Sequence, residues 1–368
     1  MSSLSPSKRR SSSSCPVDRV EAFARTIPTD APESDGTLAW DSTTIVIVRV
    51  FAGDEVGLGY TYTHDAAVRL IEDKLAPAVR GADVEQDLSR VWHEMGALLR
   101  NVGRPGMGFM ALSAVDIALW DLRARLLGQP LVDALGGLRD DAAVYGSGGF
   151  TSYPLERLAE QLSGWVEQGI PRVKIKVGRS PEDDPDRLDA ARVAIGDATE
   201  LYVDANGAFD RDDAVDWANR FANDWNVTWF EEPVSSADAE GLRHVREHSP
   251  PQLDVAAGEY AYVPADFLNL LRANAVDCLQ IDATRCGGYT GFLQAAGAAE
   301  QYGLQISAHC APQASAHVCC AVSNFRHIEY FHDHVRVECE LFDGVLEPHD
   351  GALRPDRSRP GHGLELKA

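Results

Sequence analysis

The segment from Arg172 to Glu232 begins with R-V-K-I-K-V (172–177), continues through L-Y-V-D-A (201–205) and ends with V-T-W-F-E-E (227–232). Each of these short runs is rich in β-branched and aromatic residues, and the longer stretches between them have the apolar spacing of amphipathic helices. Strands that alternate with helices in this way pair in parallel, because each helix carries the chain back to the start of the next strand. The segment therefore predicts consecutive β/α units of a parallel sheet.

Five more runs of the same kind extend the series along the chain. The eight predicted strands centre near Val144, Ile175, Val203, Trp229, Val255, Leu279, Ile306 and Ile328. Their spacing suits a closed parallel barrel but also allows an open sheet. The ionisable residues at the strand ends are Lys176, Asp204, Glu231, Glu259, Asp282, His309 and Glu329. A barrel gathers such ends at one face and an open sheet scatters them, so the pattern favours a barrel.

The chain before the barrel has a mixed pattern. An alternating strand is predicted at Thr43–Val50, and a buried helix at Ala111–Leu127 that stops at Gly128-Gln129-Pro130. This mixture is typical of an α+β domain. The predicted parts are, in order, a Ser-rich disordered tail at 1–16, an α+β domain at 17–138, the barrel at 139–340 and a C-terminal segment at 341–368.

Composition narrows the classes of function. The chain has 34 Lys and Arg against 56 Asp and Glu, a formal charge of −22, which argues against nucleic acid or an anionic membrane as a partner. The seven cysteines are an odd number without a C-x-x-C pair, so we expect reduced thiols and a cytoplasmic location. No apolar run has the length of a membrane helix, and the first residues lack the apolar centre of a signal peptide.

Three acids at consecutive strand ends predict a metal site. Asp204 lies in V-D-A-N-G, Glu231 in F-E-E-P and Glu259 in A-G-E. Carboxylate-only ligation favours Mg2+ or Mn2+ over zinc. Glu232 competes with Glu231 for the second position and ranks behind it, because neighbouring strand residues face opposite ways.

Two lysines precede the acids by one strand. Lys174 and Lys176 are two residues apart, so both amines point to the same side of the strand, towards the barrel interior. Their mutual repulsion favours the loss of one proton, which predicts a lowered lysine pKa and a general base near neutral pH.

A histidine and an acid follow on later strands. His309 in I-S-A-H-C and Asp282 in Q-I-D-A-T-R are one β/α unit apart, so adjacent strand ends can bring them into hydrogen-bond reach. A carboxylate behind an imidazole fixes its tautomer. This pair would lie across the barrel from Lys176, and Glu329 would supply a donor or acceptor to a substrate carboxylate.

The order of the motifs is more specific than any one of them. K-x-K, V-D-A-N-G, E-E-P, G-E, D-x-x-R-x-G-G, S-A-H and a late I-E follow one another along the chain. With S-A-V-D-I-A-L-W-D-L before the barrel and P-G-H-G-L-E near the end, the series resembles the mandelate racemase subgroup of the enolase superfamily over nearly the whole chain. The resemblance implies an α/β protein with a modified (β/α)7β TIM barrel, an α+β N-terminal capping domain and a C-terminal segment that returns to that domain.

The resemblance also implies roles and partners. One Mg2+ per subunit, with Mn2+ as a substitute, would be held by Asp204, Glu231 and Glu259. Lys176 and the His309–Asp282 pair would be the two acid/base groups, with Lys174 as their electrostatic neighbour. Members of this subgroup take a small-molecule carboxylate, and an even-numbered homo-oligomer is expected.

Two bases on opposite faces allow two kinds of reaction. Removal of the proton α to the carboxylate through an enediolate, followed by loss of a C3 hydroxyl, dehydrates an acid sugar to a 2-keto-3-deoxy acid. Return of the proton to the other face instead racemises or epimerises a 2-hydroxy acid. Dehydration is favoured, because subgroup members with this full set are most often acid-sugar dehydratases.

Substrate contacts are expected mainly in two loops of the capping domain, Thr29–Thr37 and Gly57–His64. The candidate substrate-binding residues are Asp30, Tyr60, Tyr62, His64, Asn206 and Gly148. We interpret G-S-G-G at 146–149 as the turn after the first barrel strand, since it lacks the Lys and Ser/Thr of a phosphate loop. H-D-H at 332–334 follows the last strand, a position that disfavours metal binding.

Two other classes of function remain as alternatives. A metal-dependent hydrolase of this barrel type would place H-x-H in its first strand, where the chain has Tyr145 and Gly146 instead. A non-catalytic scaffold would have no need to keep two lysines, three acids and a His–Asp pair in register. It would bind no Mg2+ and exchange no α-proton.

Overall fold

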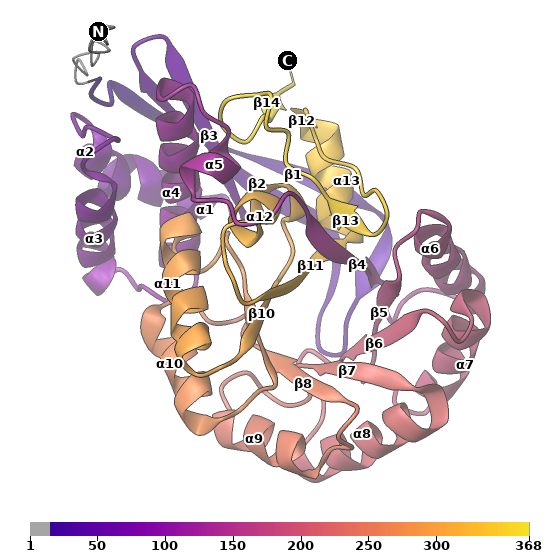
Figure 1. The fold of residues 1–368 in the computed structure, drawn as a ribbon. Helices are drawn as coiled ribbons and strands as arrows, with labels where there is room; N and C mark the ends of the chain where they lie inside the picture. The colour runs from indigo at the N-terminus through magenta and orange to yellow at the C-terminus, as the bar shows by residue number, and fades with distance from the viewer. Residues whose placement is uncertain (1–14, 368) are drawn as a thin grey trace, which may run out of the picture.

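A closed parallel barrel forms the larger part of the molecule in the computed structural model, which describes residues 15–367 (Figure 1). Its strands are β4 (Ala142–Gly148), β5 (Arg172–Lys176), β6 (Glu200–Asp204), β7 (Val227–Glu231), β8 (Asp254–Ala257), β9 (Cys278–Ile281), β10 (Gln305–Ala308) and β11 (Phe325–Phe331). They pair in chain order, and β11 pairs in parallel with β4 to close the ring. The predicted barrel is confirmed.

Seven helices connect the eight strands and cover the outside of the barrel (Figure 1). They are α6 (Leu155–Glu167), α7 (Asp184–Ile195), α8 (Arg211–Trp225), α9 (Ala239–His248), α10 (Pro264–Ala273), α11 (Gly288–Gln301) and α12 (Pro312–Cys319). Aliphatic strand residues such as Val173, Ile175 and Val203 are buried against this layer. The alternate residues Lys174, Lys176 and Tyr202 face the interior, because successive strand side chains point to opposite faces.

The barrel interior changes character along its axis. Tyr145, Tyr202 and Trp229 pack together within it, and Trp229 and Tyr202 stack with ring centroids 5.5 Å apart. The buried ring of His327 packs against the same three side chains, so this part of the interior is an aromatic cluster. Charged side chains such as Lys176, Asp204 and Glu231 instead lie at the carboxyl ends of the strands, where barrel enzymes place their chemistry.

The capping domain is a three-stranded antiparallel sheet covered by helices. Its strands are β1 (Arg19–Ser34), β2 (Ala39–Ala52) and β3 (Glu55–Tyr62). Its helical segments are α1 (Ala66–Leu70), the π-helical turn η1 (Ile71–Leu75), α2 (Ala76–Val79), α3 (Leu88–Leu98), the 3-10 turn η2 (Leu99–Asn101), α4 (Met107–Leu126) and α5 (Leu131–Ala134). The predicted strand lies within β2, and the predicted buried helix corresponds to α4, which begins four residues earlier than expected.

Both predicted capping-domain loops are largely strand. β1 runs to Ser34, and a bulge between Pro28 and Glu33 lets its pairing with β2 continue to Ala39. β3 includes Gly57 and Gly59, which were expected in a loop. A Cβ at either glycine would lie 2.1–2.2 Å from a backbone oxygen of α4, so these glycines let the strand approach the helix closely.

The C-terminal residues contact both parts of the molecule. They comprise α13 (His332–Leu341), β12 (Phe342–Asp343), β13 (Ala352–Leu353) and β14 (Glu365–Leu366). β13 pairs with β4 of the barrel, whereas Arg125 of α4 donates to Glu365 at 2.9 Å, and this segment lies beside the capping strands in Figure 1.

The N-terminal tail expected at 1–16 lies outside the described residues except for Cys15 and Pro16, and Pro16 forms a bridge with Asp83. Among the helices within residues 15–367, none combines the length and apolarity that a membrane crossing requires.

Candidate active site

The three predicted metal acids meet at the carboxyl ends of β6, β7 and β8. Asp204 and Glu231 are the last residues of their strands and are direct partners in the sheet register. Glu259 lies two residues beyond β8, after Gly258 turns the chain with a φ of 133°. One carboxylate oxygen from each of the three buried acids lies within 4.8 Å of the others.

The donor set suits a divalent cation that prefers oxygen. Three carboxylates converge, and the buried Asn206 Oδ1 beside them accepts no hydrogen bond from any residue between 15 and 367. Burial and the charge of Asp204 raise the pKa of Glu231 well above its usual value, which reflects acids held together against their repulsion. A bound cation with hard oxygen ligands would offset that repulsion.

Glu232 takes a different direction from Glu231. Its backbone has a φ of 40°, and its Oε1 accepts a hydrogen bond from the Gly258 amide at 3.0 Å. It is not in the group of converging carboxylates, whereas Glu231 is. The geometry thus agrees with the ranking of Glu231 ahead of Glu232.

Both lysines of β5 point into the barrel and contact the acids. Lys176 donates to Asp204, its neighbour in the register, and Lys174 pairs with Glu231 and with Glu329. The predicted lowering of a lysine pKa is wrong when only the charges of the protein itself act on the lysines, without a bound cation. Burial and the charge of Lys174 do lower the pKa of Lys176, but the attractions of Asp204, Glu259 and Glu329 together outweigh them and leave the pKa above its ordinary value.

His309 and Asp282 form a hydrogen-bonded pair at the ends of β10 and β9. His309 Nδ1 lies 2.8 Å from Asp282 Oδ2, which leaves Nε2 facing the interior, 3.3 Å from Glu259 Oε2. Burial opposes ionisation of Asp282, yet the hydrogen bond from His309 and the charge of Arg285 hold its pKa below the usual value. Asp282 is therefore an acceptor that fixes the Nδ1–H tautomer of His309.

Glu329 lies within β11, two residues before the strand ends. Its Oε1 accepts from Ser147 Oγ at 2.6 Å and pairs with Lys174 Nζ at 2.7 Å. Burial opposes its ionisation, but the charges of Lys174 and His309 prevail and hold its pKa well below the usual value. An ionised Glu329 is an acceptor only, which suits its contacts with Ser147 and Lys174, and donation to a substrate carboxylate would require it to bind a proton.

Three supporting residues had not been assigned a role from the sequence. Arg285 donates to the backbone oxygen of Glu259 at 3.0 Å and lies 3.3 Å from Asp282 Oδ2, so it ties two strand ends together. Thr284 donates to Asp282 through its amide and its hydroxyl, both at 2.7 Å. Ser147 is the third. Arg285 belongs to the quoted D-x-x-R pattern, which could have indicated it.

The end of β1 reaches the barrel. Thr151 donates its amide to Ser34 O at 2.8 Å, and Ser152 donates to Pro32 O at 2.7 Å, both just after β4. Asp30 pairs with Arg157 at 2.9 Å and with His332 at 3.1 Å. The carboxylate of Asp30 is thus engaged by barrel side chains, and His332, the first residue of H-D-H, belongs to this contact.

Tyr60 and Tyr62 belong to strand β3 and not to a loop, contrary to the prediction. Both are buried between the capping domain and the barrel. Tyr60 Oη donates to Glu338 at 2.6 Å and accepts from the Ala314 amide at 3.1 Å, while Tyr62 stacks on His334 with ring centroids 3.4 Å apart. His334 Nδ1 in turn accepts from the Ala311 amide at 3.2 Å. The two tyrosines therefore support the segment that follows His309.

The other substrate-binding candidates have mixed outcomes. Asn206 lies beside the acids and donates its amide to Asp204 Oδ1 at 2.9 Å. His64 is exposed, unlike the three buried acids, and pairs with Asp65 at 2.8 Å. Gly148 is part of β4 instead of a turn, and a Cβ there would meet Gln161 of α6, so this position faces the helix layer.

Glu338 gives the contact between the domains a pH dependence. Burial raises its pKa from 4.5 to about 8. The folded chain then keeps a proton that the unfolded chain releases, so between those pH values this residue lowers the free energy of unfolding by about 1.4 kcal/mol per pH unit. We expect Glu338→Gln, which retains an acceptor for Tyr60, to weaken the fall in Tm between pH 5 and pH 8.

Thermal melts at each pH unit measure this effect, with Glu347→Gln at an exposed position as the matched control. Equal pH slopes for wild type and Glu338→Gln would show that Glu338 ionises freely in the folded protein.

Fold and site together define a class of protein. A closed (β/α) barrel carries three converging carboxylates on adjacent strands, with a lysine pair on one side and a His–Asp pair on the other. A separate α+β domain contacts the segment that carries the histidine. This is the architecture of barrel enzymes that combine a divalent cation with acid/base groups.

The family follows from two matches that together span most of the chain. Residues 20–136 match the mandelate racemase / muconate lactonizing enzyme N-terminal domain, and residues 157–368 match the enolase C-terminal domain-like family. The chain belongs to the enolase superfamily, in its mandelate racemase group, as the sequence resemblance indicated.

Individual relatives resemble the chain over almost its whole length. A mandelate racemase/muconate lactonizing enzyme-like protein from Rubrobacter xylanophilus is 56% identical, with a TM-score of 0.94 over 96% of this chain and 97% of that one. The 3,6-anhydro-alpha-L-galactonate cycloisomerase of Streptomyces coelicolor is 33% identical over 95% of this chain and 97% of its own. L-Talarate dehydratase from Polaromonas sp. JS666, complexed with Mg and L-glucarate, is 31% identical, with a TM-score of 0.85 over 96% and 95%.

Proposed function

We propose that this protein is a Mg2+-dependent acid-sugar dehydratase. It removes the proton α to a substrate carboxylate and expels the C3 hydroxyl to give a 2-keto-3-deoxy acid. The observation that carries the proposal is the strand order, in which Lys176 on β5 and the His309–Asp282 pair after β9 and β10 flank the three strands that bear the buried carboxylates. The dehydratase named among the relatives supports the choice of reaction.

Asp204, Glu231 and Glu259 are the residues that would hold the ion. When bound, Mg2+ supplies positive charge that stabilises the negative charge developing on the substrate carboxylate. Lys174 and Lys176 add to this charge from β5 in a site where every group named is buried, so their electrostatic effect is larger than in water.

Proton transfer is the task of Lys176 and His309. One of them takes the α-proton, and the other, on the far side of the barrel, donates a proton to the departing hydroxyl. Asp282 keeps His309 Nδ1 protonated, so Nε2 is the nitrogen that exchanges a proton with the substrate. Arg285 and Thr284 hold Asp282 in place for this purpose.

Two related outcomes start from the same proton removal. The relative named as a cycloisomerase of a 3,6-anhydro sugar acid favours elimination of a C3 ring oxygen in place of a hydroxyl as the second candidate. Return of the proton to the opposite face would give racemisation or epimerisation, because the two acid/base groups flank the acids.

A substrate panel in D2O with Mg2+ separates these reactions. Mono- and diacid sugars and a 3,6-anhydro sugar acid are incubated with the full chain, and products are followed by NMR and by a 2-keto acid assay. Release of a 2-keto-3-deoxy acid from an open-chain acid sugar is the expected result. Deuterium incorporation at Cα without a keto product would contradict dehydration in favour of racemisation or epimerisation, and turnover of only the anhydro acid would indicate ring opening.

A further inference from the structure

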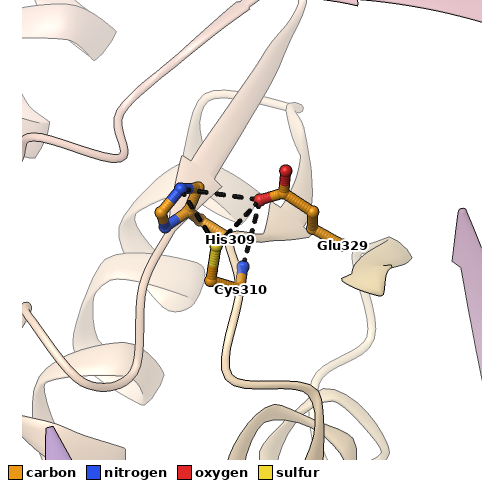
Figure 2. Close-up of side chains that lie close together, drawn as sticks. All are labelled: His309, Cys310 and Glu329. Atoms are coloured by element: carbon orange, nitrogen blue, oxygen red, sulfur yellow. Dashed lines mark hydrogen bonds and ion pairs between the residues drawn. The ribbon is translucent and has the colours of Figure 1, made fainter. Parts of the chain in front are cut away.

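Cys310 lies close to His309 and Glu329, and all three side chains can bind a metal ion. Its Sγ lies 3.3 Å from His309 Nε2 and 3.3 Å from Glu329 Oε2, and the last two atoms are 3.5 Å apart. Figure 2 shows the three side chains pointing toward one another, with contacts along all three sides of the triangle. All three residues are buried.

The backbone turns the side chain of Cys310 to the same side as that of His309. Successive residues of an extended chain face opposite ways, so Cys310 would normally point away from His309. Instead Cys310 and Ala311 have φ values of 50° and 42°, in the left-handed region that residues with a side chain seldom adopt. The turn is supported by hydrogen bonds from the Cys310 amide to Glu329 at 3.2 Å and from the Ala311 amide to His334.

The triangle has the dimensions of one face of a tetrahedral zinc site. Zinc bonds of about 2.3 Å to sulfur and about 2.0–2.2 Å to nitrogen and oxygen put tetrahedral ligand atoms about 3.4–3.6 Å apart. The three separations in the protein are within 0.3 Å of those values. Three protein ligands would leave the fourth position open.

The ligand types separate this site from the carboxylate site beside it. Asp204, Glu231 and Glu259 offer only oxygen, which suits Mg2+, whereas a thiolate with an imidazole and a carboxylate favours zinc. A coordinated thiol loses its proton to the ion. The two sites are neighbours, since His309 Nε2 lies 3.3 Å from Glu259 Oε2.

We propose that His309, Cys310 and Glu329 form an inhibitory zinc site. Zinc bound there occupies Nε2 of His309, the nitrogen that faces the carboxylate cluster, and the oxygen of Glu329 that faces His309. This inhibition rests on the proposed function, in which His309 Nε2 transfers a proton: zinc bound to that nitrogen inhibits the Mg2+-loaded enzyme reversibly, and chelation of zinc restores its activity.

Binding is tested first, by a measurement that needs no substrate. The full chain, saturated with Mg2+, is titrated with Co2+ as a spectroscopic substitute for zinc, and thiolate-to-cobalt charge-transfer absorption is followed. One equivalent per chain is expected in wild type and in Cys339→Ser, an exposed-cysteine control. Cys310→Ala and Cys310→Ser should lose the band, and their zinc affinity in competition should fall at least about 10-fold. Circular dichroism melts establish that each variant is folded.

Inhibition is tested second, as the ratio of α-proton exchange rates with and without zinc at saturating Mg2+. We expect zinc to inhibit wild type and Cys339→Ser and to lose at least about 10-fold in potency against both Cys310 variants. A charge-transfer band that persists in folded Cys310→Ala would overturn the site, as would its absence from wild type at saturating Co2+. Equal zinc inhibition of wild type and Cys310→Ala would place the inhibitory ion at the three carboxylates instead.

Discussion

His309→Asn and Lys176→Ala are each expected to abolish turnover while the chain stays folded. General acid–base groups contribute about 10²–10⁴-fold to rate, and dehydration needs both a base for the α-proton and an acid for the departing hydroxyl. Asn keeps a polar side chain near Asp282 but lacks the imidazole nitrogen Nε2 that would transfer a proton to or from the substrate. Ala removes the β5 amine that points at Asp204.

The two variants should differ in one respect. In D2O, the variant that lacks the acid still exchanges the α-proton of a substrate without releasing product, whereas the variant that lacks the base does neither. Proton NMR of the substrate measures the exchange, and a 2-keto acid assay measures elimination. His349→Asn and Lys74→Ala, both at exposed positions, are the matched controls. Full turnover by either active-site variant would remove that residue from the proposed chemistry.

Most of the fold could be predicted because it depends on local pattern. Short β-rich runs alternate with amphipathic helices over about 200 residues, and a parallel connection leaves few other topologies. The meeting of Asp204, Glu231 and Glu259 was also predictable, since it requires only that strand ends lie on one face of the barrel. The contact between His309 and Asp282 follows from the same geometry.

The capping domain was harder to interpret from the sequence. Gly57 and Gly59 are as typical of a turn as of a strand, and only the packing of β3 on α4 makes them strand residues. Tyr60 and Tyr62 looked available to a substrate because their partners, Glu338 and His334, lie more than 270 residues away. No local pattern indicates such a contact.

The lysine pKa shows a different limit of sequence reasoning. Two neighbouring amines do repel each other, and that part of the expectation was sound. It omitted the acids that face them, because the sizes of opposing charge effects depend on distances and burial that a sequence does not give. Cys310 was missed for a similar reason, since a positive φ turned it toward His309 against the alternation expected of an extended chain.

Glu231→Gln is expected to lower Mg2+ affinity by at least about 10–100-fold and turnover by at least about 10²-fold. It replaces one of three converging carboxylates by a neutral group of the same shape, so the loss reflects charge and ligation more than packing. Changes outside the ligand shell already cost 10–100-fold in metal affinity, and lost electrostatic stabilisation costs about 10²–10³-fold in rate. Isothermal titration of the chelator-treated chain with Mg2+ measures the affinity.

Glu232→Gln is the matched control, one residue along the chain and equally buried. Its Oε1 accepts from the Gly258 amide, a hydrogen bond that Gln can also accept, so Mg2+ affinity should stay within about 3-fold of wild type. Melting curves without Mg2+ report whether either substitution disturbs the fold, since Glu231 also pairs with Lys174. The reverse result, with affinity lost in Glu232→Gln and retained in Glu231→Gln, would show that Glu232 binds the ion in place of Glu231. Retention in both would mean that the converging acids are not the Mg2+ ligands.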